Sequence, residues 1–343
     1  MHSRFNGLLE DDPVLYRFIK KRERCVEMAS LDDIQTMGIL GAGQMGGGIA
    51  QVAATAGLRV LLIDASLDLA DNGKRQIAGA LAKQVDKGMM VPDARDEVLA
   101  RIQTAGAPDR VAECDFVIEA ATERLDLKIA LLRKADAALA PGKWLASNTS
   151  SISLTKLAAA TSRPDRVIGM HFMNPPPLMK LVEVVRAVQT SDETHALTLA
   201  LAAKMGKTTT TTTDAPGFLV NRILLPLLCE ACFALQEGVG TVADIDTSAK
   251  LGLNHPMGPF ELSDLIGLDT VLAIADVLHR EFGDDKYRAP TILRNLVAAG
   301  RLGRKSGRGF YTYEERATSK MSPLRPSGGA AGPASVTQGS AAC

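Results

Sequence analysis

One histidine and one glutamate have the residue types and the spacing of a general base and its partner. His171 lies in an apolar run over residues 167–172, and Glu183 lies in a β-branched run over residues 181–185. The prolines 175–177 cannot continue either run, so we expect two short strands joined by a rigid turn. Because a buried carboxylate needs a partner, Glu183 is expected to bind one ring nitrogen of His171. The other nitrogen could then accept a substrate proton; the alternative is a histidine that only fills the core.

A glycine-rich turn indicates where a nucleotide would bind. Residues 36–40 predict a buried strand, and a G-x-G-x-x-G turn and a helical run follow it directly. The turn consists of Gly41, Ala42, Gly43, Gln44, Met45 and Gly46. This order lets free N–H groups at the helix start face a pyrophosphate, whereas a glycine turn used for packing alone is the alternative. The next strand, residues 59–63, ends in Asp64, whose charge suits ribose hydroxyls and favours NAD over NADP.

Polar residues follow two further predicted strands. Glu123 and Lys128 come after the apolar run 114–118, and the small polar residues 148–151 come after the run 143–147. Ligands of a doubly wound sheet are contacted from the carboxyl ends of its strands, so Glu123 and Lys128 are candidates for ribose or nicotinamide contacts. The alternative is an exposed acid and a solvated lysine. The donors in 148–151 exceed what one helix cap needs, which indicates a ligand.

Composition excludes some classes of protein. Lys plus Arg and Asp plus Glu both total 39, so the net charge is zero and no global field attracts nucleic acid or an acidic membrane. The five cysteines form no regular framework, and the C-x-x-C pair Cys229 and Cys232 lies in an apolar helical stretch, where packing is the expected role. We therefore expect a cytoplasmic protein without metal, nucleic-acid or membrane partners.

The periodicity along the chain predicts an α/β fold followed by helices. We expect a disordered extension over residues 1–27, with Met28 as the natural start, and a disordered tail over residues 317–343. Residues 28–213 predict an NAD-binding Rossmann-type domain with a doubly wound sheet and a helical arm over 67–104. Residues 214–316 predict an all-helical domain for substrate binding and dimerisation.

Six motifs together resemble one enzyme family. Between about residues 37 and 313 the chain resembles the 3-hydroxyacyl-CoA dehydrogenases, and most of all the short bacterial 3-hydroxybutyryl-CoA dehydrogenases. The motifs occupy residues 41–46, 148–151, 171–175, 181–184, 216–222 and 254–259. The resemblance implies NAD-dependent interconversion of (S)-3-hydroxyacyl-CoA and 3-oxoacyl-CoA in fatty-acid or butanoate metabolism. It also implies a homodimer assembled through the helical domain.

The resemblance further implies roles for individual residues. His171 would be the catalytic base with Glu183 as its partner, while Asn221 and Ser150 would position the substrate. Lys87 would contact coenzyme A, although Ala80 stands where some relatives have a serine beside it. Besides the glycine turn, the implied NAD contacts are Asp64, Glu123, Lys128, Asn148, Asn174 and Lys305.

Two other functions stay open at this point. A sugar-acid dehydrogenase of the gulonate and lambda-crystallin branch has similar motifs and would act on a different substrate. A non-catalytic NAD-binding protein would be expected to have lost His171 or Glu183, and both are present.

Overall fold

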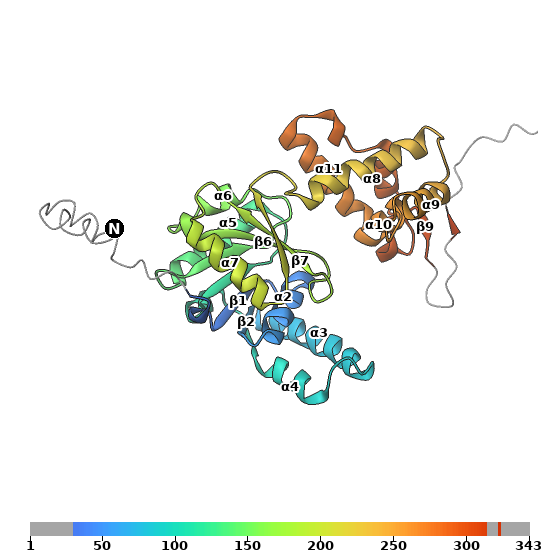
Figure 1. Cartoon of the computed structure of the whole chain (residues 1–343). Coiled ribbons are helices and arrows are strands. Elements are labelled where there is room, and N and C mark those ends of the chain that lie inside the picture. Colours follow the sequence, from blue (N-terminus) through green and yellow to red (C-terminus); the bar gives the residue numbers. More distant parts are fainter. Residues whose placement is uncertain (1–29, 314–321, 324–343) are drawn as a thin grey trace, which may run out of the picture. The chain divides into compact units, whose positions relative to one another are not determined.

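The computed structural model describes residues 30–313 and 322–323 of the chain, which divides into two compact units at Leu219 and Val220 (Figure 1). The predicted extension over 1–27 lies outside the described residues. So does the predicted tail over 317–343, except for Ser322–Pro323, which pair as β10 with β9 (Tyr311–Thr312). The unit boundary falls a few residues beyond the domain boundary that we expected at residue 214.

The first unit is built on an eight-stranded sheet with the order β3-β2-β1-β4-β5-β6-β7-β8. Its strands are β1 Thr36–Leu40, β2 Arg59–Ile63, β3 Ile102–Ala105, β4 Phe116–Glu119, β5 Trp144–Ser147, β6 Val167–Phe172, β7 Leu181–Arg186 and β8 Thr208–Thr213. Strands β6 and β7 pair antiparallel, and the other neighbours in this sheet run parallel. The strand order reverses direction between β1 and β4, which is where doubly wound sheets bind nucleotides.

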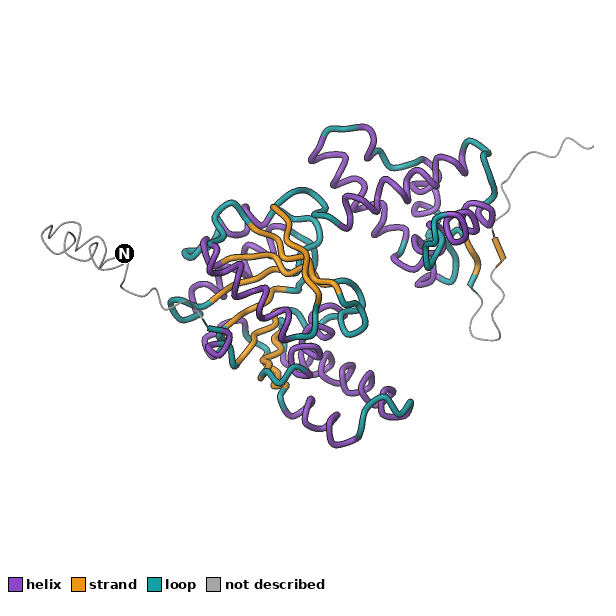
Figure 2. Tube along the Cα trace, in the orientation of Figure 1, coloured by secondary structure: helices purple, strands orange, loops and turns teal. Residues whose placement is uncertain are grey.

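Helices cover both faces of this sheet, as Figure 2 shows in purple. They are η1 Leu31–Asp33, α2 Gln44–Thr55, α3 Leu67–Asp86, α4 Pro92–Ala100, η2 Pro108–Glu113, α5 Leu125–Ala138, α6 Leu154–Ala158, η3 Pro164–Arg166 and α7 Asp192–Lys204. Alternate residues of one strand enter different cores: Ile39 packs into one apolar cluster and Leu40 into the other. The predicted Rossmann-type α/β fold is therefore confirmed.

The predicted helical arm over 67–104 was wrong at its C-terminal end. Helix α3 stops at Asp86, Gly88 has a left-handed φ of 68°, and Pro92 opens the separate helix α4. The last residues, Ile102–Ala105, form strand β3, which pairs with β2 at the edge of the sheet. Four residues are too few to show a clear period, so the neighbouring helices dominated the pattern.

The second unit is helical. Its elements are α8 Val220–Gln236, α9 Val242–Gly252, α10 Pro259–Ile266, α11 Leu268–Phe282, η4 Asp285–Tyr287, α12 Thr291–Ala298 and η5 Arg304–Ser306, with the short pair β9 and β10. The buried Asp264 carboxylate accepts hydrogen bonds from the N–H groups of Phe310 and Tyr311 at 3.0 and 2.9 Å. This bonding fixes the glycine-rich segment before β9 against α10.

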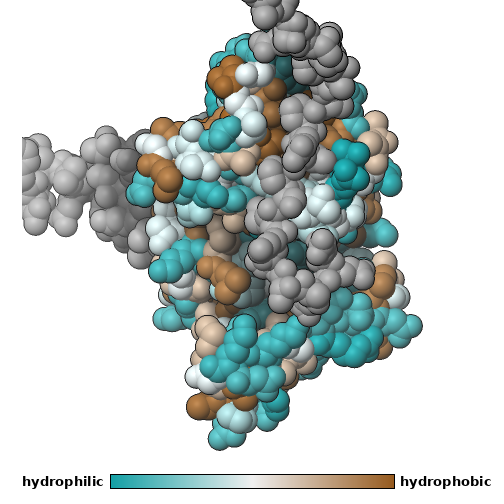
Figure 3. All heavy atoms as spheres, turned by 90° about the vertical axis from the view of Figure 1, so that its right-hand side faces the viewer, coloured by the Kyte–Doolittle hydropathy of each residue, from teal (hydrophilic) through white to brown (hydrophobic). Residues whose placement is uncertain are grey.

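Several large apolar side chains of the second unit are exposed. They are Ile223, Val239, Leu251, Leu253 and Leu265. In the view of Figure 3, hydrophobic residues lie scattered among hydrophilic ones on the visible surface. Within the described residues, no helix combines the length and the apolarity that crossing a membrane requires.

Candidate active site

The register of the antiparallel pair β6–β7 places His171 directly opposite Glu183. Opposed residues of two paired strands share one face, so their side chains meet. The distance from His171 Nδ1 to Glu183 Oε2 is 2.7 Å. Glu183 is fully buried and His171 is 8% exposed. The contact that we expected between these two side chains is therefore present.

The second oxygen of Glu183 and the imidazole face are held by the segment before α8. The N–H of Leu219 donates to Glu183 Oε1 at 2.9 Å, and the ring of Phe218 meets the imidazole edge to face at 5.7 Å between centroids. An ionised carboxylate can only accept hydrogen bonds, so Nδ1 of His171 carries the proton and donates it. This leaves Nε2 with a lone pair that can accept a proton.

A second group of charged side chains lies at the carboxyl ends of β4 and β5. The ammonium of Lys128 binds Glu119 Oε1 and Oε2 at 2.8 and 2.9 Å and lies 3.3 Å from Glu123 Oε2. Glu119 and Lys128 are almost completely buried. Lys128 is thus not the solvated lysine of our alternative interpretation, and its contacts in the described structure are to carboxylates and to the Ala121 carbonyl oxygen at 3.1 Å.

Glu123 gathers the polar loop after β5. Its Oε1 accepts hydrogen bonds from Thr149 Oγ1 at 2.5 Å, from the N–H of Ser150 at 2.8 Å and from the N–H of Ser151 at 3.1 Å. Burial alone would raise the pKa of Glu123, but Lys128 and these hydrogen bonds hold that pKa below its ordinary value. The donors that we assigned to a ligand from the sequence thus already have a protein acceptor.

Asn148 ties this loop to the strand that carries His171. Its side-chain oxygen Oδ1 accepts a hydrogen bond from the N–H of Phe172, the residue after His171, at 2.9 Å. The loop after β5 and the end of β6 are therefore held together next to the base.

The glycine turn has the geometry that a pyrophosphate site needs. Gly41 has a left-handed φ of 105°, and a side chain at Gly46 would overlap the Gly41 carbonyl oxygen. A Cβ at Gly43 would meet nothing within 4 Å, and no side chain of the described residues caps the start of α2 there. Backbone N–H groups at this helix end are therefore open to an anion.

Two polar side chains flank the glycine turn. Asp64 Oδ2 accepts a hydrogen bond from the N–H of Ala42 at 2.7 Å, so the acid at the end of β2 also fixes the turn. Gln44 Nε2 donates to Asn174 Oδ1 at 3.1 Å, which brings the proline turn between β6 and β7 to the same place. The residues present therefore fit a dinucleotide at the carboxyl edge of the sheet.

For three of the expected site residues, the described contacts do not test the predicted role. Lys87 is exposed at the end of α3. Asn221 is buried in the first turn of α8, and Lys305 forms an ion pair with Asp269 in the second unit. Their roles remain predictions from the family resemblance.

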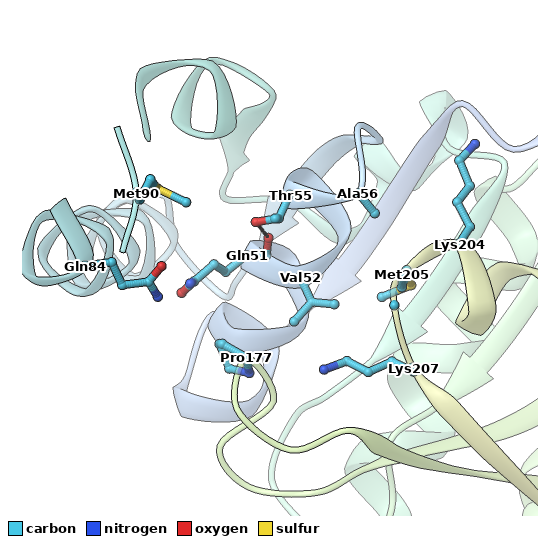
Figure 4. A pocket seen from close by; sticks show the side chains of 11 residues that line it. Gln51, Val52, Thr55, Ala56, Gln84, Met90, Pro177, Lys204, Met205 and Lys207 are labelled. Carbon is cyan, nitrogen blue, oxygen red and sulfur yellow. Dashed lines mark hydrogen bonds between the residues drawn. The ribbon is translucent and has the colours of Figure 1, made fainter. Parts of the chain in front are cut away.

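Figure 4 shows a hollow of about 390 Å³ in the first unit, and neither His171 nor Glu183 is among the residues that line it. It is lined by the C-terminal half of α2, the end of α3, the proline turn and the loop between α7 and β8. From this loop Lys207 donates to the carbonyl oxygens of Pro176 and Met179 at 2.6 and 2.9 Å. Lys207 thereby fastens the proline turn that carries Asn174.

A nucleotide site at the switch point of a doubly wound sheet, next to a histidine held by a buried carboxylate, defines a dinucleotide-dependent dehydrogenase. Comparison with known proteins agrees. The family model described as 3-hydroxyacyl-CoA dehydrogenase, NAD binding domain, matches residues 36–215, and the model of the C-terminal domain matches residues 217–313. The chain belongs to the 3-hydroxyacyl-CoA dehydrogenase family. The predicted resemblance and the choice of NAD are thus confirmed.

Three similar proteins share the name 3-hydroxybutyryl-CoA dehydrogenase. The chain is 51% identical over 280 residues to the 3-hydroxybutyryl-CoA dehydrogenase of Bradyrhizobium diazoefficiens, covering 82% of this chain and 96% of the relative. It is 48% identical over 284 residues to a probable 3-hydroxybutyryl-CoA dehydrogenase of Bacillus subtilis, covering 83% and 99%. The crystal structure of (S)-3-hydroxybutyryl-CoA dehydrogenase from Ralstonia eutropha is 49% identical, with a TM-score of 0.80, and covers 82% of this chain and all of that one.

The Asp64→Ala substitution is expected to weaken NADH binding about tenfold or more, because the acceptor of the Ala42 N–H, which is also the predicted acceptor for ribose hydroxyls, is lost. NADPH should be affected less, since its 2′-phosphate no longer meets a carboxylate. Titration of both cofactors by fluorescence gives the two dissociation constants. The exposed Asp68→Ala variant is the control, and an unchanged ratio of the two constants would contradict the role of Asp64.

Proposed function

We propose that this chain oxidises short-chain (S)-3-hydroxyacyl-CoA, such as 3-hydroxybutyryl-CoA, to 3-oxoacyl-CoA with NAD and catalyses the reverse reduction. The observation that carries the proposal is the 2.7 Å contact between His171 and Glu183, in the same sheet whose strands β1 and β4 form the nucleotide-binding switch point. The names of relatives at about half identity over most of the chain support the substrate class. Fatty-acid oxidation and butanoate metabolism both contain this reaction.

The arrangement lets His171 move one proton. Its Nε2 accepts the proton of the substrate 3-hydroxyl, and in the reverse direction the imidazole returns it. Bound NAD supplies the acceptor for the hydride that leaves C3. Positive charge appears on the imidazole, and the buried Glu183 carboxylate lowers the cost of that charge. A general base of this kind contributes a factor of about 10² to 10⁴ to the rate.

Other residues hold the reactants. Ser150, whose N–H is fixed by Glu123, and Asn221 would orient the substrate oxygen, and Lys87 would meet coenzyme A. NAD would be bound by the glycine turn and by Asp64, Glu123, Lys128, Asn148, Asn174 and Lys305. Lys128 would do so through the carboxylates that it binds, because its side chain is 1% exposed.

We also propose an assembly and a location. Residues 28–213 would form the NAD-binding domain, and residues 214–316 would form the helical domain through which two copies associate. Exposed apolar side chains on the second unit, such as Ile223 at 72% and Leu251 at 84% exposure, support this association. The free thiols Cys114, Cys229 and Cys232 suit a reducing compartment such as the cytoplasm.

Turnover of two substrates separates the proposed function from its nearest alternative. We expect NADH-dependent reduction of acetoacetyl-CoA, followed by NADH absorbance, and no NAD-dependent oxidation of gulonate. A series of 3-oxoacyl-CoA substrates of increasing length then measures the chain-length preference. Gulonate oxidation without acetoacetyl-CoA reduction would assign the chain to the sugar-acid branch.

The His171→Gln substitution is expected to lower kcat about 10² to 10⁴-fold, because no group remains to accept the hydroxyl proton. The dissociation constant of NADH should stay within about twofold, since the side chain of His171 bonds to Glu183 and packs against Phe218, both outside the glycine turn. The matched control is His195→Gln, which alters a histidine of α7 bonded to Thr211. A His171→Gln enzyme with ordinary turnover would refute the assignment of the base.

Introducing two charges on the second unit tests the homodimer. We expect wild-type protein to sediment as a dimer and the double variant Ile223→Glu, Leu251→Glu to sediment as a monomer, because buried unpaired charges oppose association. The control is Val188→Glu on the first unit, where the side chain is 87% exposed. A wild-type monomer at micromolar concentration would contradict the proposed assembly.

A further inference from the structure

Glu119 is a buried carboxylate with no role in the mechanism above. It ends strand β4, between β1 and β5, and is 0% exposed. Its Oε1 accepts hydrogen bonds from the N–H of Ala121 at 2.6 Å and from Lys128 at 2.8 Å. Its Oε2 accepts from Ser147 Oγ at 2.7 Å and from Lys128 at 2.9 Å. A carboxylate that accepts four hydrogen bonds, from three groups, is rigidly placed.

The contacts of Lys128 are divided unequally between two carboxylates. Its ammonium has three donors, and the three short contacts go to both oxygens of Glu119 and to the Ala121 carbonyl oxygen at 3.1 Å. The distance to Glu123 Oε2 is longer, at 3.3 Å. The bonds from Lys128 to Glu119 therefore keep its ammonium from forming an equally short contact with Glu123.

This division leaves one oxygen of Glu123 for the loop after β5. Oε1 of Glu123 accepts from Thr149, Ser150 and Ser151, while Oε2 faces Lys128. Without Glu119, the only remaining carboxylate bound to Lys128 in the described residues would be that of Glu123. Lys128 would then attract Glu123 more strongly and pull it away from the loop over residues 149–151. Glu119 also bonds to the loop through its backbone, since its carbonyl oxygen accepts from the N–H of Asn148 at 2.7 Å.

We propose that Glu119 is a positioning residue for the cofactor side of the active site: it binds Lys128 and so leaves Glu123 and the loop over residues 149–151 in the geometry that holds NAD and the substrate. The NAD part rests on the proposed contact of Glu123 with NAD. The substrate part rests on the proposed function, because it acts through Ser150.

The experiment compares the full-length wild-type chain with Glu119→Gln, Lys128→Met and the double variant. NADH affinity is measured by fluorescence titration, stability by urea unfolding, and kcat and KM with acetoacetyl-CoA. We expect Glu119→Gln to weaken NADH binding about tenfold and to lower kcat. Lys128→Met should unfold at the lowest urea concentration, because it leaves Glu119 buried without its counter-ion.

The double variant separates positioning from stability. Replacing both charges should restore much of the stability lost in Lys128→Met, but NADH binding should stay about tenfold weak, because Glu123 then lacks Lys128 and has only the loop over residues 149–151 to hold it. A double variant that regains wild-type NADH affinity together with its stability would overturn the proposal. The same holds for a Glu119→Gln variant with unchanged NADH affinity.

Two further variants complete the test. The pair Asp136→Asn, Arg163→Met removes another largely buried ion pair of the same unit, at 2.6 Å, and should lower stability while NADH affinity stays unchanged. Ser147→Ala keeps every charge and removes one hydrogen bond from Glu119. We expect this variant to bind NADH about threefold more weakly. If Glu119→Gln does not fold, a Ser147→Ala variant with wild-type NADH affinity overturns the proposal. A wild type that binds NADH but ignores acetoacetyl-CoA would refute the proposed function and leave the NADH test of Glu119 intact.

Discussion

The site depends on one constraint: a carboxylate that is taken out of water must be bonded at both of its oxygens. Glu183 meets this constraint with Nδ1 of His171 and with the N–H of Leu219. The antiparallel register of β6 and β7 supplies the first partner, and the segment before α8 supplies the second. The same bonds that make Glu183 tolerable in the core also fix the tautomer of His171, so stability and chemistry have one cause.

The same constraint operates at the switch point of the sheet. Glu119 is bonded at both oxygens, and the lysine that neutralises it also lies near Glu123. The parallel strands β4 and β5 end side by side. Glu119 and Glu123, at and after the end of β4, therefore lie next to the loop over residues 148–151 that follows β5. Two buried carboxylates thus organise the two halves of the site, one on the base side and one on the cofactor side.

The sequence predicted those parts of the site that depend on residues close together in the chain. The strands β1, β2 and β6, the glycine turn and the pairing of His171 with Glu183 follow from apolar runs, from glycine and from the cost of an unpaired buried acid. Strand β3 was missed because its four residues carry no clear period. The burial of Lys128 and its bond to Glu119 were also missed, since a single lysine on an amphipathic helix is usually solvated. The contact from Glu123 to Thr149 spans 26 residues, and no periodicity encodes such a contact.

The backbone at Phe218 shows what the geometry of the base costs. A bulky residue with a φ of 51° stores about 1–3 kcal/mol and persists only where its surroundings determine its conformation. Here the ring packs against His171, and the next N–H reaches Glu183. An extended conformation at Phe218 would redirect both groups. The strained backbone at Phe218 therefore lies where it helps to hold Glu183 and His171 in place. The ring contact with His171 and the hydrogen bond to Glu183 both depend on this conformation, and both compensate its energetic cost.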